Sequence, residues 1–486
     1  MEKIQCLFCD KEYDSEFNFC PYCGKEKLTT EVTKVDIENG VKDEFGVIYS
    51  KDGLRLLRVD NWEFEECTIE EGTKVICDKA FDECEFEMVI IPAGVISIGY
   101  CAFSRCWNLQ SVIISNGVVD IDDCAFSMCY SLKDIILPNS VKNIGELSFM
   151  DCGFHSIILP EGLISIGNDA FRRSQLESVI IPGSVKELGS SAFYECSGLK
   201  SVIVSDGVSV IGEDAFRGCN KLESVIIPAS VKTIEPCAFY GCDNLRNVTI
   251  ENGVTSIGNF AFANCVNILS ITIPQSVSSL GDYAFDECCN LETVNILGRV
   301  SCIGKNTFAG CEELSSISLP SSIVSIDDGA FECCYSLQSI TLPDKLKCIG
   351  NNAFLGSGLY SVTIPERVKS IGDRAFLNYD LREVTFHNDN IRFGKEVFYK
   401  KELLKFHCLS LFFDVSDSEL YCNDFSLNSE FSSYVREESF DYDEECDSSD
   451  DYDDSLDYYP DDDDYTIEDS YSDAFDGFDD AYWNID

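Results

Sequence analysis

The sequence predicts an α/β repeat solenoid of parallel short strands, and three observations carry this prediction. Phenylalanine recurs every 22 or 23 residues over residues 81–398. The residues between follow the pattern L-x-S-V-x-I-P-x-S-V-x-x-I-G-x-x-A-F-x-x-C, of which residues 222–242 keep all but the Gly. Wherever the interval is 22 residues, the missing residue lies between the phenylalanine and the next apolar residue. A loop varies in length in this way. Such a period indicates coils that stack on one another. The recurring residues are Phe81, Phe103, Phe126, Phe149, Phe171, Phe193, Phe216, Phe239, Phe262, Phe285, Phe308, Phe331, Phe354, Phe376 and Phe398.

Each coil can be divided into three segments. Residues 201–204 alternate as Ser-Val-Ile-Val, which is the period of a strand with one buried side. A Pro usually ends this strand, and residues 211–212 close a second extended stretch. Residues 212–219 place Ala215, Phe216 and Cys219 at helical spacing, which predicts about one helical turn with these side chains inward. Because one coil cannot bury its apolar edge alone, equivalent strands should pair in parallel.

The repeat resembles the BspA-like branch of the leucine-rich-repeat proteins over about residues 45–404. This resemblance implies a parallel short-strand superhelix of about 14 coils of 22–23 residues. Residues 45–58 also resemble the hairpin that often precedes such arrays, with Lys-Asp-Gly as its turn. BspA-like members are often secreted or surface proteins that bind host proteins, so the resemblance implies a binding function.

The domain boundaries follow from the period and the composition. We expect a zinc ribbon in residues 1–28, a linker in 29–44, and a capping hairpin with a first partial coil in 45–80. The solenoid should occupy residues 81–408, and an acidic, aromatic-rich disordered tail residues 409–486.

The N-terminal cysteines have the spacing of a metal site. Cys6 and Cys9 form one Cys-x-x-Cys pair, and Cys20 and Cys23 form a second pair after ten residues. Two such turns complete a tetrahedral Cys₄ site, typical of a zinc ribbon, whereas the alternatives are a redox pair or chance. Four thiolates leave no open position, so we expect one structural Zn²⁺ per chain without Lewis-acid chemistry.

A second group of cysteines occupies one column, three residues after the repeat phenylalanine. A metal or disulfide ladder is one interpretation, but a small buried side chain in a tight turn is favoured, because Cys is buried as readily as Ile or Val. The column consists of Cys84, Cys106, Cys129, Cys152, Cys196, Cys219, Cys242, Cys265, Cys288, Cys311 and Cys334.

No catalytic motif stands out, so the sequence predicts a protein that is not an enzyme. Its only histidines, His155, His387 and His407, do not recur with a nucleophile at a motif spacing. A net charge of −50 disfavours nucleic acid and anionic membranes, and no stretch approaches the roughly 20 apolar residues of a membrane span. The first residues lack the apolar core of a secretory signal, which predicts a cytoplasmic location.

The tail carries about half of the charge, with 28 acidic residues and one basic residue in 414–486. Its low content of aliphatic residues predicts disorder. The interleaved aromatic residues leave two interpretations open, a solubilising segment or a binding segment for a basic, partly apolar surface.

One column of the first strand should point away from the core. It holds isoleucine in seven successive coils and polar residues in the next seven. Strand propensity alone accommodates either choice, but exposed apolar stripes of this length usually mark a partner site. The isoleucines are Ile90, Ile113, Ile136, Ile158, Ile180, Ile203 and Ile226.

We therefore expect a non-catalytic scaffold whose repeat surface binds an unidentified protein, with basic partners favoured by the charge. Two alternatives stay open: an exported adhesin that binds host or matrix proteins, and an acidic tail that mimics nucleic acid to occupy a basic protein. The oligomeric state does not follow from the sequence.

Overall fold

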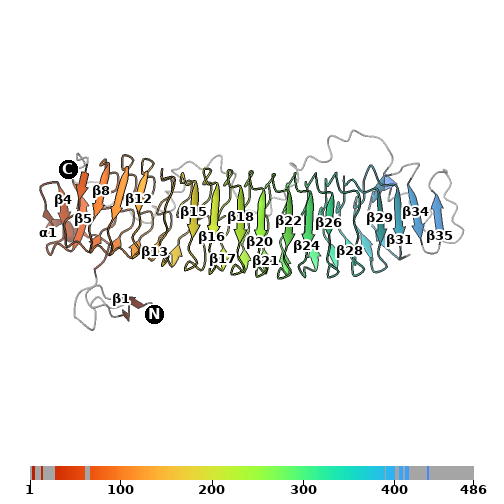
Figure 1. Cartoon of the computed structure of the whole chain (residues 1–486), viewed down its shortest axis with the longest axis horizontal. Coiled ribbons are helices and arrows are strands. Elements are labelled where there is room, and N and C mark those ends of the chain that lie inside the picture. Colours follow the sequence, from red (N-terminus) through yellow and green to blue (C-terminus); the bar gives the residue numbers. More distant parts are fainter. Residues whose placement is uncertain are drawn as a thin grey trace. The chain divides into compact units, whose positions relative to one another are not determined.

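The structure is a computed structural model that describes residues 3–5, 12–14, 28–60, 66–388, 390–399, 404–408, 411–414 and 435–436. The chain divides into two compact units, Met1–Glu438 and Ser439–Asp486, and every described residue belongs to the first. Within this unit, coils follow one another as a stack of short parallel strands (Figure 1). The predicted parallel-strand leucine-rich-repeat solenoid is thereby confirmed.

The first strands of the coils form one surface, here called the wide face. Neighbouring strands pair in parallel and in register, so that Ile180 lies beside Ile203 and Ile203 beside Ile226. The first block contains β6 (Glu66–Thr68), β8 (Met88–Ile91), β10 (Ser111–Ile114) and β12 (Asp134–Ile136). The second contains β15 (Ser178–Ile181), β16 (Ser201–Val204), β18 (Ser224–Ile227), β20 (Asn247–Ile250), β22 (Ser270–Ile273), β24 (Thr293–Ile296) and β26 (Ser316–Ser318). The third contains β29 (Ser361–Ile364), β31 (Glu383–Phe386), β34 (Lys405–Cys408) and β35 (Leu411–Asp414).

Residues 154–159 and 337–342 separate these blocks without forming strands. The shortened connection that leads into residues 154–159 contains Gly153, and the one that leads into β29, one coil after residues 337–342, contains Gly358. A Cβ atom at either glycine would collide with the carbonyl oxygen of Tyr130 or Tyr335 in the preceding coil. At Gly153 and Gly358, successive coils therefore approach closely enough to require glycine.

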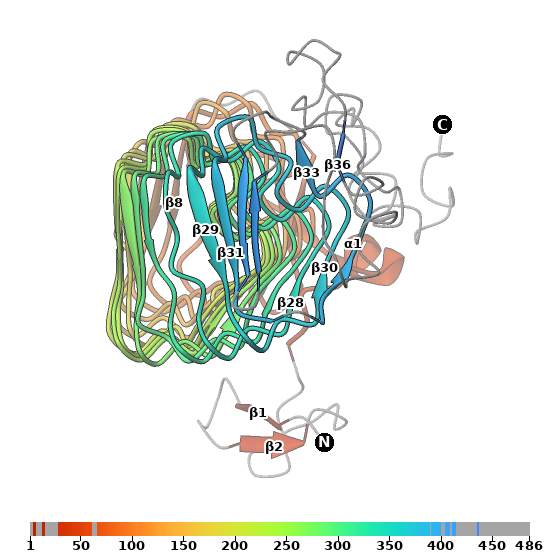
Figure 2. The ribbon, with the colours of Figure 1, turned by 90° about the vertical axis from the view of Figure 1, so that its right-hand side faces the viewer.

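The second extended stretches form the narrow face, which lies on another side of each coil (Figure 2). Its first block contains β7 (Val75–Ile76), β9 (Ser97–Ile98), β11 (Asp120–Ile121), β13 (Asn143–Ile144) and β14 (Ser165–Ile166). The next block contains β17 (Val210–Ile211), β19 (Thr233–Ile234), β21 (Ser256–Ile257) and β23 (Ser279–Leu280). The last contains β25 (Cys302–Ile303), β27 (Ser325–Ile326), β28 (Cys348–Ile349), β30 (Ser370–Ile371) and β32 (Arg392–Phe393).

The Gly-x-x-Ala-Phe-x-x-Cys segment differs from the helical turn expected of it and forms consecutive turns. Asp214 and Gly218 have positive φ angles of 52° and 69°. The backbone N–H of Phe216 donates to Ala238 of the next coil at 2.8 Å, and that of Gly218 to Tyr240 at 2.9 Å. These N–H groups are thus directed at the neighbouring coil, whereas a helix would use them within the coil. Among the described residues the only α-helix is α1 (Lys34–Asn39), so the α component is small.

The repeat phenylalanines form a continuous buried stack. Each ring from Phe81 to Phe398 lies nearly parallel to the next, at 4.8–5.9 Å between centroids. All of these side chains are fully buried. One hydrophobic core therefore runs through the whole array.

Antiparallel strands close the first coil. The hairpin expected in residues 45–58 is formed by β4 (Val47–Tyr49) and β5 (Arg55–Val59), with β3 (Val41–Lys42) beside β4. Helix α1 has a capping box in which Thr33 and Asp36 satisfy each other's backbone N–H groups. Residues 29–44, predicted as a linker, therefore contain a capped helix, whose residue Ile37 packs on the first coil.

The array also continues past residue 408, where the tail was expected to begin. Strand β35 pairs antiparallel with β34, and β36 (Val435–Arg436) pairs in parallel with β33 (Phe398–Tyr399). The described parts of residues 409–436 thus extend the last sheets. The remainder of the predicted tail lies outside the described residues.

Candidate protein-binding face

Strand alternation positions the isoleucine column on the outside of the wide face. In β16, Val202 and Val204 are buried, whereas Ile203 is 57% exposed. This follows because successive side chains of a strand point to opposite faces of the sheet.

The isoleucines form an apolar stripe along seven coils. Ile158 is 83% exposed, and Ile90 is half-buried. The remaining five are between 41% and 67% exposed: Ile113, Ile136, Ile180, Ile203 and Ile226. Hydrogen-bonded neighbours keep the side chains in line, except at Ile158, which lies in the interrupted segment 154–159. We call these seven residues the isoleucine stripe.

The isoleucine stripe ends between two adjacent strands of the sheet. Ile226 in β18 lies beside Thr249 in β20, and the same column stays polar from there on. These residues are exposed or half-exposed: Thr249, Thr272, Asn295, Ser318, Thr341, Thr363 and Thr385. From β20 on, this column therefore presents polar side chains in place of isoleucine, while Leu269, Leu297 and Tyr360 are exposed apolar side chains elsewhere in the C-terminal coils.

Two exposed aromatic side chains, which the sequence reasoning missed, lie close in the chain to the stripe. Trp107 and Tyr130 are 50% and 48% exposed and belong to the connections that lead into β10 and β12. Trp and Tyr are over-represented among residues that dominate binding energy at interfaces. Their position directly after the cysteine column is the only signal that could have identified them.

The charged residues before the first strands border the stripe. Lys200 Nζ and Glu177 carboxylate lie 2.9 Å apart, each about half exposed. Such an exposed pair contributes little stability. It places opposite charges in two neighbouring coils at this border.

The cysteine column is a buried structural element. Cys219 Sγ donates to the carbonyl oxygen of Phe193 in the preceding coil at 3.2 Å, and Cys242 Sγ does the same to Phe216. Burial raises the pKa of the Cys219 thiol well above its ordinary value, which keeps it protonated as a donor. Among the described residues, the cysteines from Cys67 to Cys348 form no disulfide bond, and most of them are buried. The interpretation as small buried residues is thereby supported over a disulfide ladder.

The predicted zinc ligands Cys6, Cys9, Cys20 and Cys23 lie outside the described residues. Strands β1 (Lys3–Gln5) and β2 (Glu12–Asp14) pair antiparallel, and the first cysteine pair falls in the connection between them. Elsewhere in the described part of the chain, no three His, Cys, Asp or Glu residues are arranged to hold a metal ion.

The histidines are distributed over separate coils. His155 lies in the interrupted segment 154–159, and His387 directly follows β31. His407 Nε2 lies 2.9 Å from the Glu383 carboxylate on the wide face. None of the described helices is long and apolar enough to cross a membrane.

Comparisons with known proteins agree with this geometry. A family model described as BspA type leucine rich repeat region, of six copies, matches residues 60–175, 164–292 and 278–405. A leucine-rich repeat protein from Bacteroides ovatus ATCC 8483 is 30% identical, with a TM-score of 0.54, over 71% of this chain and 91% of that chain. The T. pallidum leucine rich repeat protein is 30% identical over 33% of this chain and 78% of its own, with a TM-score of 0.32.

A leucine rich cell surface protein from Faecalibacterium prausnitzii A2-165 is 22% identical over 71% of this chain and 94% of its own, with a TM-score of 0.37. No curated protein is a significant match to the sequence. The family model alone spans well over half of the chain, and the Bacteroides ovatus structure shares its fold. On this evidence the chain belongs to the BspA-type leucine-rich-repeat family.

Proposed function

We propose that this protein is a non-catalytic scaffold that binds a protein partner through the isoleucine stripe. The observation that carries the proposal is the single-step change from isoleucine to polar residues between β18 and β20. Both residue types suit strands, so strand propensity does not explain why seven isoleucines precede seven polar residues. Binding of an apolar partner surface to one half of the face does explain it.

The charge of the chain favours partners with basic or neutral surfaces. A net charge of −50 repels acidic proteins at long range and attracts basic ones. Trp107 and Tyr130 would supply rigid aromatic contacts at the N-terminal part of the stripe. The cytoplasmic location predicted from the sequence belongs to the same proposal.

We further propose that Cys6, Cys9, Cys20 and Cys23 hold one structural Zn²⁺. The antiparallel pairing of β1 and β2 supports this, because it brings the chain back on itself around the first cysteine pair. Four thiolates would close the coordination shell and stabilise a segment that has little other core.

A substitution that copies the C-terminal half of the face tests the binding proposal. Changing Ile158, Ile180 and Ile203 together to Thr should leave folding intact, because Thr occupies the same column in coils that fold. Affinity capture from native lysate, quantified against the wild-type chain, should show loss of the captured partner.

The matched control changes Thr249, Thr272 and Thr363 to Ser in the same column. This variant should capture as much partner as the wild type. Equal capture by all three chains would show that the stripe is not the binding site.

A further inference from the structure

We propose that Cys101 and Cys124, two thiols in adjacent coils, form a site of reversible oxidation at which a hydroperoxide generates a disulfide bond. Both lie two residues before a repeat phenylalanine, and neither belongs to the cysteine column that follows these phenylalanines. We call the positions two residues before each repeat phenylalanine the outer column. The inference is independent of the proposed binding function. Its basis is the register of the two coils, the surroundings of the two thiols and their place near the surface.

The two coils hold Cys101 and Cys124 side by side. The backbone N–H of Cys101 donates to the carbonyl oxygen of Asp123 at 3.0 Å. Two residues further on, the rings of Phe103 and Phe126 stack at 5.0 Å between centroids. Adjacent coils are spaced by about 4.8 Å. This spacing falls within the roughly 4.4–6.8 Å that a disulfide bond allows between its two Cα atoms.

Side chains in the outer column meet from one coil to the next. Both cysteines have positive φ angles, 50° at Cys101 and 55° at Cys124, so their Cα–Cβ bonds point in the same direction. Elsewhere in the outer column, the rings of Phe260 and Tyr283 stack at 4.5 Å between centroids. The thiols of Cys101 and Cys124 likewise hydrogen-bond to each other. A disulfide bond between them therefore needs a rotation of the side chains and no change of register.

The surroundings of Cys101 favour its thiolate over that of Cys124. The Cys124 thiol donates a hydrogen bond to the Cys101 sulfur, and this bond lowers the pKa of Cys101. The Tyr100 side chain and the Lys79 ammonium, which lies 5.9 Å from the centroid of the Tyr100 ring, also lower this pKa. Burial and Asp82 oppose them. Because the shared hydrogen bond raises the pKa of Cys124, Cys101 is the more readily ionised thiol and Cys124 keeps its proton.

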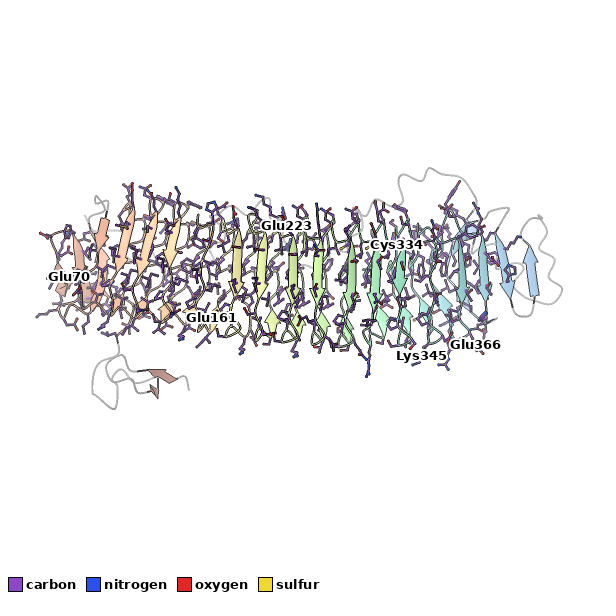
Figure 3. All side chains as sticks on the ribbon, in the orientation of Figure 1. Glu70, Glu161, Glu223, Cys334, Lys345 and Glu366 are labelled. Atoms are coloured by element: carbon purple, nitrogen blue, oxygen red, sulfur yellow. The ribbon has the colours of Figure 1, made fainter. Side chains whose placement is uncertain are left out.

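The cysteine column has different surroundings. Cys129 Sγ donates to the carbonyl oxygen of Phe103 at 3.2 Å, and Cys152 Sγ donates to the equivalent carbonyl oxygen at 3.1 Å. Burial raises the pKa of the Cys129 thiol well above its ordinary value. Figure 3 shows another of these buried thiols, Cys334, inside the outline of the array, with Lys345 at its lower edge. The thiols of the cysteine column therefore stay protonated as donors to the backbone and are poor nucleophiles.

The outer column lies close to the surface of the array. Lys79 and Arg374 are members of it and are exposed. Cys124 is 5% exposed, whereas the thiols of the cysteine column are at most 2% exposed. A small oxidant such as hydrogen peroxide therefore has a shorter path to Cys124 and Cys101 than to the cysteine column.

The oxidation takes place in two balanced steps. The Cys101 sulfur attacks one oxygen of the hydroperoxide, the O–O bond breaks, and Cys101 becomes a sulfenic acid. With hydrogen peroxide, the leaving oxygen takes up the proton of the Cys101 thiol and departs as water. The Cys124 sulfur then attacks the Cys101 sulfur, the S–O bond breaks, and the released hydroxide takes the Cys124 proton to give a second water. The two thiols lose two electrons and two protons, and a dithiol reductant reverses the reaction.

Peptide mapping of the full chain after graded exposure to hydrogen peroxide tests the proposal. The remaining thiols are alkylated in denaturant before digestion, and each cysteine is assigned by fragmentation of its peptide. Cys101 and Cys124 should lose alkylation together and appear as a linked pair, and dithiothreitol should restore both thiols. Cys129 and Cys152, an adjacent-coil pair of the cysteine column, should stay alkylated at the same peroxide concentration. If Cys101 and Cys124 stay fully alkylated, or if Cys129 and Cys152 link equally readily, the proposal is overturned.

Single substitutions test the roles of the two thiols. Cys124→Ser should leave Cys101 as a sulfenic acid that dimedone traps, and Cys101→Ser should give no dimedone adduct on Cys124. The matched control is Cys237→Ser, because Cys237 belongs to the outer column but has Asp214 and Phe260 as its neighbours there. This control should form the link as the wild type does. A dimedone adduct on Cys124 in the Cys101→Ser variant would overturn the assigned order of attack. Circular dichroism shows whether each variant keeps the fold, and the wild-type peptide map decides the proposal if a variant does not.

Discussion

Most coils place a phenylalanine and a cysteine where they contact the neighbouring coils. Phe216 stacks between Phe193 and Phe239 at 5.4 and 5.3 Å. Cys219 Sγ donates to the Phe193 carbonyl oxygen, so the thiol also satisfies a buried acceptor. Both side chains are completely buried. The two residues together explain why this part of the repeat tolerates so little variation in size.

Replacing Phe216 by Ala should destabilise the array by roughly 3–5 kcal/mol, as for other large buried aromatics. The cavity would separate two ring stacks, and neighbouring coils cannot close it without breaking their register. Urea unfolding followed by circular dichroism measures the change. Tyr360→Ala is the control, since Tyr360 is 59% exposed and its loss should cost little. Equal effects of both substitutions would contradict the stacked core.

The stability of the array should fall between about pH 4 and pH 8 because of Asp286. Burial, together with Glu287 and Glu332, raises the pKa of this carboxyl to about 8. The unfolded chain releases the proton near pH 4, whereas the folded chain keeps it up to about pH 8. The stabilising contribution is therefore complete below pH 4 and is lost as the pH rises through 8.

The Asp286→Asn variant cannot ionise at this position. At pH 8 it should be more stable than the wild type by at least about 1.4 kcal/mol, which corresponds to one pKa unit. At pH 4 the two chains should unfold at similar urea concentrations. A difference that does not depend on pH would show that Asp286 is not the titrating group.

Within a coil, the extended segments were predictable and the turns were not. The Ser-Val-Ile-Val alternation of residues 201–204 indicates which side chains are buried, and the structure agrees. Ala215, Phe216 and Cys219 are buried as expected, but the spacing of buried residues does not reveal the sign of φ. Ser191 and Glu195 have positive φ angles although they are not glycines, so their residue types do not indicate this conformation.

The candidate binding face was only partly predictable for the same reason. Strand alternation identified the isoleucine stripe, because a period of two determines the exposed side. Trp107 and Tyr130 belong to connections that have no period, so their exposure could not be inferred. Capped helix α1 was missed because Thr33 and Asp36 form a single short capping box without a long amphipathic pattern.

Zinc should be bound by the N-terminal segment independently of the repeats. Elemental analysis of protein purified without chelators should find one zinc per chain. Chelation should change the signals of the ribbon and leave the unfolding transition of the array unchanged, since the array has its own core. Replacing Cys20 and Cys23 by Ser should abolish the bound zinc. Zinc retained by this variant would place the metal elsewhere.

At the scale of the whole chain, the last sheets determine where a truncation is tolerated. The first compact unit ends at Glu438, beyond β36. Truncation after Glu438 should therefore leave the melting temperature of the array nearly unchanged. Truncation after Cys408 removes β35 and β36 and exposes the edge of β34, which should lower the melting temperature and promote aggregation. Equal melting temperatures of both truncations, measured by differential scanning calorimetry, would contradict a structural role of β35 and β36.

The phenylalanine stack also bears on how such a chain can change in length. Every coil meets its neighbours through the same ring contact and the same in-register strand, so a duplicated coil would find both contacts already matched. Duplication of a coil that carries isoleucine would lengthen the stripe by about 4.8 Å, one rung, without altering the surface before or after it. Recombination between repeats could therefore adjust the reach of the binding surface in whole-coil increments, with no need for new side-chain packing.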